Sequence, residues 1–332
     1  MTKSIDIKTV GVYHPKNKVS NEKFIRHYQS KGKDIVPMLH TFGRNSRYLS
    51  DDANENTITM AANACKNALK KSNLSAEDID LLIFSSGTPE YLAPSNAIKV
   101  HELIGGRSNA IAYDMNSNCV GMLIAVEQTS RYMQANPEIK YALVVGSEQM
   151  NRYSQEEDEY TRANFGDAAC AVILEKTNSS VSGFQNAAYH INSTRSSVML
   201  FPKCGLSNMY NPNISVEDKK ILWTGGTANN GFVLAKALIE QVLEKQCIDI
   251  KRVNKFFISQ VCRENMDILS NSLGVERDCF EYIGDEYGYT GTSSPFIALN
   301  HAIESNTVHR GDNIVFWSVG TGYISCALLW KY

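Results

Sequence analysis

The sequence predicts an α/β fold made of two copies of one α/β unit. Along most of the 332-residue chain, short apolar stretches of strand length alternate with amphipathic stretches of helix length. This order is typical of mixed or parallel sheets that are covered by helices on both faces. Four segments of the first half also recur, in the same order, in the second half. The length of the chain agrees with two such units, because a domain usually takes about 100–200 residues.

The first recurring pair predicts a helix, a polar turn and a strand. NALKKSNLSAEDIDLLIFSS (67–86) aligns without a gap with QVLEKQCIDIKRVNKFFISQ (241–260), so that Leu69 lies opposite Leu243. Each copy begins with apolar residues at helical spacing and ends with four or five apolar residues in a row, as in a buried strand.

Three further pairs follow in the same order. LIGGRSNAIAYDM and SLGVERDCFEYIG each predict the end of a helix, a Gly stop and a strand, and the remaining two pairs predict strands. The pairs are 103–115 with 272–284, 140–148 with 312–320, and 169–175 with 325–331. Because four pairs keep one order, we interpret them as a duplication and expect the halves to span 1–178 and 179–332.

Two stretches interrupt the repeat. Residues 15–52 are rich in Lys, Arg and aromatic residues, and residues 192–226 carry no regular apolar pattern. Long irregular insertions in compact domains are often functional. We therefore expect both stretches to contribute to a site.

Composition excludes several classes of protein. The chain has 33 Lys and Arg against 35 Asp and Glu, for a net charge of −2, so it lacks the basic bias of a nucleic-acid groove or an anionic membrane face. Its apolar runs are far shorter than the about 20 residues of a membrane span, and charges near the N-terminus interrupt any signal peptide. No His or Cys cluster has metal-ligand spacing. We expect a cytoplasmic protein without nucleic-acid, membrane or metal partners.

One of the eight cysteines has a setting that suits a nucleophile. Seven are scattered in helix, strand or loop contexts without a CxxC pair, which favours buried reduced thiols. Cys119 instead falls between a strand that ends at Asp114 and Met115 and a helix expected from about Val120. A helix N-terminus lowers a cysteine pKa, and Gly121 would let a substrate approach the backbone. The alternative is that Cys119 only fills the core.

Around Cys119 the chain resembles a known family. The strings NCVGMLIAVEQTSRYM, YALVVGSE, NFGDAACAVIL, EYGYTGTSSPFIAL and VGTGYISCALLW resemble beta-ketoacyl-acyl-carrier-protein synthase III, of the thiolase superfamily, over essentially the whole chain. The resemblance implies a thiolase-like fold, a five-layer α-β-α-β-α sandwich, and a homodimer. It also implies an acyl-thioester on Cys119, with an oxyanion hole made by the backbone N–H of Cys119 and the turn of Gly320, Thr321 and Gly322.

The chain departs from this family at two residues. The His and Asn that assist decarboxylation of malonyl-carrier protein correspond to Ser259 and Tyr289. A Ser hydroxyl has no pKa near neutrality and a Tyr phenol titrates at about 10, so neither replaces a His base. We therefore expect an acyltransferase that passes the acyl group to a carbon, oxygen or nitrogen acceptor, in fatty-acid or specialised biosynthesis. The alternative is a non-decarboxylating or silent partner subunit of a synthase heterodimer.

His190 is the candidate general base. It lies in the apolar strand NAAYHIN, which we expect to be central in the second sheet. A core or dimer-contact histidine is an equally open interpretation.

The acyl donor is expected to be a substrate, coenzyme A or the phosphopantetheine of an acyl carrier protein, and no permanent cofactor is expected. The family's Trp and Arg for the nucleotide correspond to Pro37 and Thr41, which argues against stacking of adenine. A basic rim could instead receive an acidic carrier protein. The candidate rim residues are Arg44, Arg47, Lys251 and Arg252.

Overall fold

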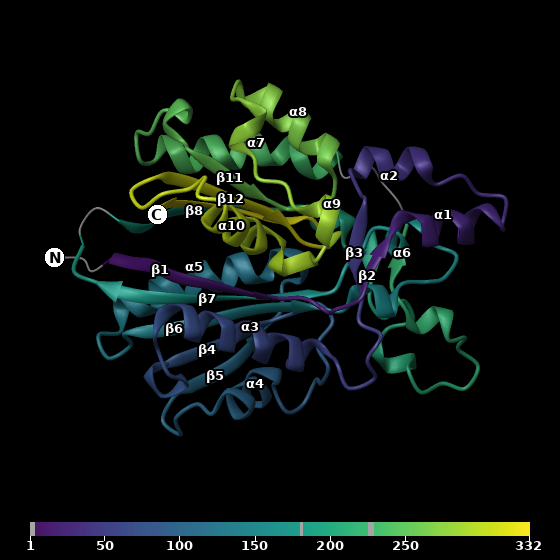
Figure 1. Cartoon of the computed structure of the whole chain (residues 1–332), viewed down its shortest axis with the longest axis horizontal. Coiled ribbons are helices and arrows are strands. Elements are labelled where there is room, and N and C mark those ends of the chain that lie inside the picture. The colour runs from purple at the N-terminus through teal and green to yellow at the C-terminus, as the bar shows by residue number, and fades with distance from the viewer. Residues whose placement is uncertain (1–3, 180–181, 225–228) are drawn as a thin grey trace.

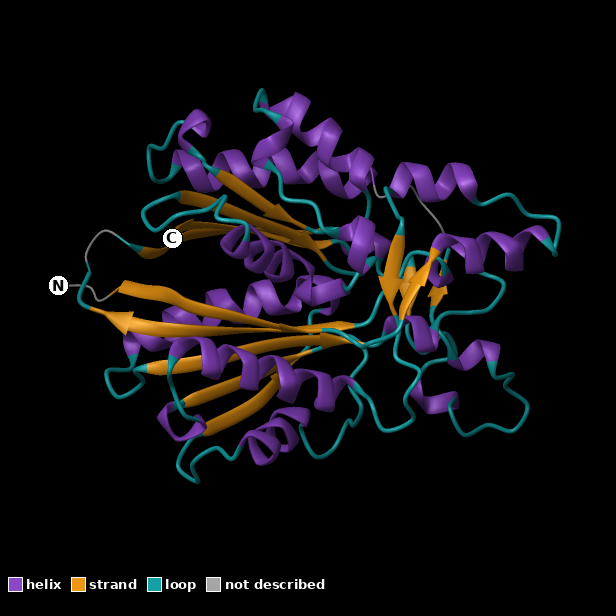
Figure 2. Ribbon diagram, in the orientation of Figure 1, coloured by secondary structure: helices purple, strands orange, loops and turns teal. Residues whose placement is uncertain are grey.

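Two mixed sheets stand face to face, with helices between them and on both outer sides (Figure 1). The computed structural model describes residues 4–179, 182–224 and 229–332. The five layers are helices, sheet, helices, sheet and helices, so the expected thiolase-like α-β-α-β-α sandwich is confirmed. Figure 2 shows that irregular segments gather on one side of the molecule, at one end of both sheets.

The first sheet has five strands in the order β1-β7-β6-β4-β5. Neighbours β4, β5 and β6 are parallel, whereas β7 runs antiparallel to both β6 and β1. The strands are β1 (Ser4–Tyr13), β4 (Leu81–Ser85), β5 (Ile111–Met115), β6 (Tyr141–Glu148) and β7 (Ala168–Thr177). The central strands β4 and β6 are buried on both faces, as their continuous apolar runs predict.

The second sheet has four strands in the order β11-β12-β13-β8. Here β11 and β12 are parallel, and β13 runs antiparallel to β12 and β8. The strands are β8 (Gly183–Ile191), β11 (Lys255–Ile258), β12 (Asn313–Val319) and β13 (Ile324–Lys331). The chain passes from one sheet to the other between Thr177 and Gly183.

Six helices form the three helical layers. One outer layer is α3 (Thr57–Ser72) with α4 (Asn96–Ile104), the central layer is α5 (Gly121–Ala135) with α10 (Ser294–Glu304), and the other outer layer is α7 (Asn229–Glu244) with α8 (Arg263–Leu273). Gly105 and Gly274 end α4 and α8 in the left-handed conformation, at φ 76° and 67°, as the repeat predicted. Within the described residues, no helix combines the length and apolar content needed to cross a membrane.

The two interruptions of the repeat contain short elements. The stretch 15–52 forms β2 (Lys18–Ser20), α1 (Asn21–Gln29), α2 (Val36–Phe42) and β3 (Ser46–Tyr48), and the stretch 192–226 contributes β9 (Met199–Leu200) and β10 (Leu222–Trp223). Two more single-turn helices, α6 (Glu159–Arg162) and α9 (Gly284–Tyr287), lie beside them. The described residues of both stretches lie on the side of the molecule where the irregular segments gather (Figure 1).

Two expectations about the second half are wrong. The strand expected after Gly274 does not form: residues 277–279 make a 3-10 turn, and Phe280 makes only an isolated bridge to Phe256. The turn includes Cys279. The strand that holds His190 is an edge strand rather than a central one, because β8 pairs with β13 alone.

Candidate active site

The Cys119 turn lies where the sequence places it. The strand β5 ends at Met115, a 3-10 turn spans Asn118–Val120, and α5 begins at Gly121. Asn118 adopts φ 52°, a left-handed conformation that few non-glycine residues take. The chain therefore turns sharply at Asn118 and presents Cys119 at the start of α5.

The β12–β13 turn holds Cys119 from the second half. The Ser318 hydroxyl donates to the carbonyl oxygen of Cys119 at 2.9 Å. A Cβ on Gly320 would lie 2.7 Å from the carbonyl oxygen of Ser117, so this approach of the two turns requires glycine. The site is thus built where the two halves of the chain meet.

The expected low pKa of Cys119 is wrong. Only 8% of the residue is exposed, and burial raises the pKa of the thiol to about 12. Burial disfavours the charged form more strongly than the helix N-terminus favours it. A thiol of this pKa is protonated at neutrality, so it needs a group that accepts its proton or the charge of the leaving group.

Gly121 has a different role from the one expected. A Cβ at this position would lie 2.5 Å from the Ser85 hydroxyl oxygen. The glycine therefore lets α5 pack closely on β4, and it does not leave room for a substrate. The next N–H of the helix, from Met122, donates to the Thr292 hydroxyl oxygen at 2.7 Å.

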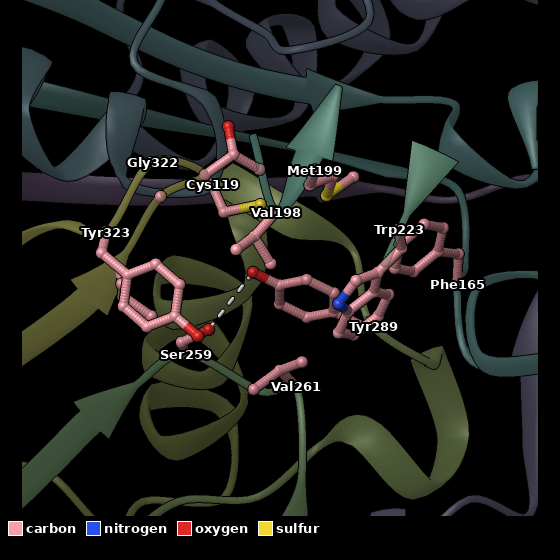
Figure 3. A pocket seen from close by; sticks show the side chains of 13 residues that line it. Cys119, Phe165, Val198, Met199, Trp223, Ser259, Val261, Tyr289, Gly322 and Tyr323 are labelled. Atoms are coloured by element: carbon pink, nitrogen blue, oxygen red, sulfur yellow. Dashed lines mark hydrogen bonds between the residues drawn. The ribbon is translucent and has the colours of Figure 1, made fainter. Parts of the chain in front are cut away.

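Ser259 and Tyr289 lie together beside Cys119 (Figure 3). Both are buried, and the Ser259 hydroxyl donates to the Tyr289 phenol oxygen at 3.3 Å. The phenol also hydrogen-bonds Cys119, which on its own lowers the thiol pKa, while burial raises the pKa of Tyr289 well above its usual value. Figure 3 shows the phenol oxygen between the cysteine sulfur and Ser259.

The backbone around Tyr289 is also fixed. Its N–H donates to the carbonyl oxygen of Asn164 at 2.9 Å, and its carbonyl accepts from the N–H of Gly166 at 3.0 Å. Because the first-half loop 164–166 holds both backbone groups, the position of the phenol depends on contacts between the two halves.

A first hollow, which we call the apolar hollow, opens on one side of Cys119. It encloses about 670 Å³, including space open to solvent. Its walls are mainly apolar and aromatic, and its lining residues are Cys119, Phe165, Val198, Met199, Trp223, Ser259, Val261, Tyr289, Val319, Gly320, Thr321, Gly322 and Tyr323. The rings of Phe165 and Trp223 are stacked, with their centres 6.2 Å apart (Figure 3).

A second hollow, which we call the Glu148 hollow, opens on another side of the same cysteine. It encloses about 740 Å³, again including space open to solvent. Its wall has both polar and apolar groups and is formed by Gly87, Thr88, Asn116, Asn118, Cys119, Glu148, Met150, Met199, Leu200, Phe201, Ile221 and Thr321. The irregular stretch 192–226 thus lines both hollows, as its position in the repeat suggested.

Glu148 is a buried ionisable residue that lines a hollow with Cys119, and the sequence reasoning did not single it out. It lies at the carboxyl end of β6, is 1% exposed, and burial raises its pKa to about 7. Glu148 is the last residue of the string YALVVGSE, but that string was used only as support for the resemblance to the family. The available signal was an acidic residue at the end of a buried strand, where parallel strands commonly place their sites.

The Gly320-Thr321-Gly322 turn lies at the hollows, but one of its N–H groups is engaged. The N–H of Gly320 donates to the carbonyl oxygen of Ile324 at 2.8 Å. Gly322 adopts φ 79°, which favours glycine and points the peptide away from the strand ladder. Of the three residues of the turn, Thr321 is the one that lines both hollows.

Comparisons with known proteins agree with this geometry. A model of the 3-oxoacyl-[acyl-carrier-protein] synthase III family matches residues 113–193. A second model, of the C-terminal part of the same family, matches residues 243–332. A beta-ketoacyl-[acyl-carrier-protein] synthase III of Clostridium perfringens is 30% identical over 325 residues, which cover 97% of each chain. The chain belongs to the synthase III family. The crystal structure of the Aquifex aeolicus synthase III is 25% identical, with a TM-score of 0.88 over 99% of this chain and 100% of that one. OleA of Xanthomonas campestris, at 18% identity and a TM-score of 0.85 over the whole of both chains, shares the fold.

Two candidate rim residues of this synthase III family member lie in its core. Arg44 is 2% exposed, and its guanidinium donates to Asn164 Oδ1 at 2.6 Å and to the carbonyl oxygens of Gln260 and Val261 at 2.6 and 2.9 Å. It also donates to the Tyr282 hydroxyl. Arg44 therefore holds the segment that follows β11, and it is not available to a carrier protein.

Arg47 is fully buried as well. Its guanidinium donates to the carbonyl oxygen of Ala163 and lies 4.5 Å from the centre of the Phe24 ring. Burial, aided by the nearby charge of Arg44, lowers the pKa of Arg47 to about 9. The sequence pattern of a basic, aromatic-rich stretch does not distinguish such a core arginine from a surface one.

The other three candidates lie away from Cys119. Lys251 and Arg252 are exposed in a 3-10 turn before β11, whereas Ser259 follows the opposite end of that strand. His190 is exposed on β8 and pairs with Ser325 of β13. None of the seven histidines, all within described parts of the chain, lines either hollow.

Proposed function

We propose that this synthase III family member is an acyltransferase that carries an acyl group on Cys119 and does not condense it with a malonyl thioester. The observation that carries the proposal is the buried group of Cys119, which lines both hollows, with Tyr289 and Ser259, which line the apolar hollow. It supplies a nucleophile and two hydroxyl donors. Neither the Tyr289 phenol nor the Ser259 hydroxyl can act as a general base at neutral pH.

In the loading step, the Cys119 sulfur attacks the carbonyl carbon of an acyl-thioester. A carbon–sulfur bond forms to Cys119, the bond to the donor sulfur breaks, and the thiol proton leaves with the donor thiol. Backbone N–H groups of Cys119 and of the 321–322 peptide are the proposed donors to the oxyanion. Tyr289 stabilises the Cys119 sulfur by its hydrogen bond. The loading step therefore does not need the usual His and Asn of the family.

The acyl chain is proposed to lie in the apolar hollow, because its lining of Phe165, Val198, Trp223 and Val261 suits an alkyl or aryl group. The curated relatives are named for acyl carrier protein, which supports a thioester of a carrier protein or coenzyme A as donor. The donor is a substrate in this scheme and not a resident cofactor.

Decarboxylation needs a donor that stabilises an enolate, and losing one such donor typically costs about 10²–10³ in rate. We expect wild-type protein to gain the mass of an acyl group when incubated with an acyl-thioester, and to release no more CO₂ from a malonyl thioester than a Cys119→Ala variant does. Intact-protein mass spectrometry and a CO₂ assay measure the two outcomes. Robust CO₂ release would show a condensing enzyme, and the absence of any adduct would favour the silent partner subunit.

We further propose a homodimer in which the β5 edges of two copies pair. Within the described residues β5 has a partner on one side only, and Ile111 and Tyr113 of this strand are 39% and 37% exposed. Exposed apolar side chains on an unpaired strand edge favour pairing with another strand.

Ile111→Asp is expected to convert this dimer to a monomer, because two added carboxylates would face each other across the paired edges. Size-exclusion chromatography with light scattering measures the mass of the particle. Ile268→Asp on α8 is a matched control, since Ile268 is 49% exposed on another face. A dimer that survives Ile111→Asp would place the interface elsewhere.

A further inference from the structure

A third hollow, which we call the α1 hollow, opens between α1 and the segment 151–162 that ends with α6 (Figure 1). It encloses about 900 Å³, including space open to solvent. None of its lining residues lines either hollow at Cys119. The α1 hollow is therefore a separate feature, which the proposed function does not use.

Cationic side chains dominate the wall of the α1 hollow. Lys23, Arg26 and His27 come from α1 and Arg162 from α6, and the one carboxylate among the lining residues is that of Glu156. His27 Nε2 lies 4.0 Å from Glu156 Oε1. Lys23, Arg26 and Arg162 have no carboxylate within ion-pair distance in the part of the chain that the structure describes. The wall thus has an excess of positive charge at neutral pH.

The acidic residues that follow Glu156 are engaged elsewhere. Glu157 pairs with Lys31 at 2.5 Å and Glu159 with Lys33 at 2.6 Å. The Asp158 carboxylate caps the start of α6. These three carboxylates are not among the lining residues, so they leave the charge of the wall largely unbalanced.

Arg162 is held in place by Asn151. Its Nη1 donates to the carbonyl oxygen of Asn151 at 2.9 Å and to Asn151 Oδ1 at 3.2 Å, and Asn151 Nδ2 donates to the carbonyl oxygen of Arg162 at 2.7 Å. Asn151 also lines the hollow and is 6% exposed. Because both bonds of the guanidinium use Nη1, the N–H groups of Nε and Nη2 stay available to a ligand. An arginine fork of this kind suits a phosphate group.

An unpaired positive charge lies next to the apolar part of the lining. Phe24 and Leu49 are buried and supply this part. The guanidinium of the fully buried Arg47 lies 4.5 Å from the centre of the Phe24 ring, and its Nε and Nη1 atoms have no hydrogen-bond partner. A buried charge without a counter-charge is costly. An anion in the α1 hollow would offset part of this cost.

We propose that the α1 hollow binds a small organic phosphate monoester, with its phosphate group between Arg162 and the cations of α1 and its organic part on Phe24 and Leu49. A phosphate monoester has close to two negative charges at neutral pH, so it matches several unpaired cations better than a carboxylate does. The chain has a net charge of −2, and this argues against nucleic acid as the ligand. The inference does not depend on acyl chemistry at Cys119.

Isothermal titration calorimetry of the whole chain tests both parts of the ligand. The probes are phenyl phosphate, inorganic phosphate and benzoate, and we expect phenyl phosphate to bind most tightly. Binding should weaken as NaCl is added, because salt screens the charges. Benzoate that binds as tightly as phenyl phosphate would overturn the phosphate group, and inorganic phosphate that does so would overturn the organic part. No saturable binding of any probe at millimolar concentration would overturn the site.

Removal of two wall charges should weaken the binding of phenyl phosphate. Lys23→Gln combined with Arg26→Gln changes two exposed residues of α1, and we expect the affinity to fall by at least ~10-fold. Lys66→Gln combined with Lys70→Gln is the matched control, because it removes two exposed cations from α3. The control should bind as wild-type protein does. Equal affinities of the two double variants would overturn the proposal.

Glu156→Gln should have the opposite effect. It removes the one carboxylate of the wall, so phenyl phosphate should bind about 3-fold more tightly. A folding defect does not produce tighter binding, and unchanged or weaker binding would overturn the position of the phosphate group. Acylation of Cys119 should be the same in all these variants and in wild-type protein. If phenyl phosphate binds but Cys119 is not acylated in any of them, the proposed function fails and the phosphate site stands.

Discussion

Cys119→Ala is expected to abolish covalent loading of an acyl group. The sulfur is the proposed nucleophile at the junction of the two hollows. The hydroxyl groups of Ser259 and Tyr289 beside it are buried and cannot replace it at neutral pH. We expect acyl transfer to fall by at least ~10⁴-fold, which is within the range for removal of a nucleophile that forms an acyl-enzyme. Intact-protein mass spectrometry after incubation with an acyl-thioester measures the adduct.

Cys262→Ala is the matched control for this experiment. Cys262 is also buried and free, at 4% exposure, but it lines neither hollow. The Cys262→Ala variant should be acylated to the same extent as wild-type protein. An adduct on Cys119→Ala that is missing on Cys262→Ala would assign the chemistry to the wrong thiol and refute the proposed site.

Arg44→Met is expected to lower the free energy of unfolding by about 3 kcal/mol or more. The substitution leaves the carbonyl oxygens of Gln260 and Val261 and the Oδ1 atom of Asn164 without their buried donor. Each buried acceptor left without a partner costs about 1–3 kcal/mol. Urea unfolding followed by circular dichroism measures the change.

Lys251→Met tests the competing interpretation of the basic residues. Lys251 is exposed and was predicted, like Arg44, to belong to a carrier-protein rim. A surface substitution of this kind usually changes stability by less than about 0.5 kcal/mol. If Arg44→Met were as stable as Lys251→Met and lost only carrier-protein delivery, the core role that the structure assigns to Arg44 would be wrong.

Some of the site follows from local sequence alone. Cys119 was found because a strand ends, a few polar residues follow and a helical pattern begins, and such a turn is specified by neighbours along the chain. The fold followed from the four recurring pairs for the same reason, since strands of four or five apolar residues and glycine stops are local signals. The strand expected within 272–284 failed because forming a strand depends on a partner, and Phe280 pairs with Phe256 at one residue only.

Other parts depend on contacts between distant residues. Arg44 and Arg47 occur in a basic, polar stretch that is typical of a surface, but Asn164, Tyr282 and the 260–261 carbonyls surround Arg44 in the core. The pKa of Cys119 rises because residues of both halves bury it, and this burial outweighs the effect of its helix N-terminus.

The sequence by itself determined the duplicated α/β fold and the turn that carries Cys119, because periodicity and turns are local properties. The two hydroxyl residues at 259 and 289 followed only from the resemblance to the family. Only the tertiary structure decided which side chains surround the sulfur. It excluded His190, which lies on an exposed edge strand, and brought Glu148 next to Cys119 from another strand. Burial raises the pKa of this glutamate, and the segments that bury it cannot be read from its neighbours along the chain.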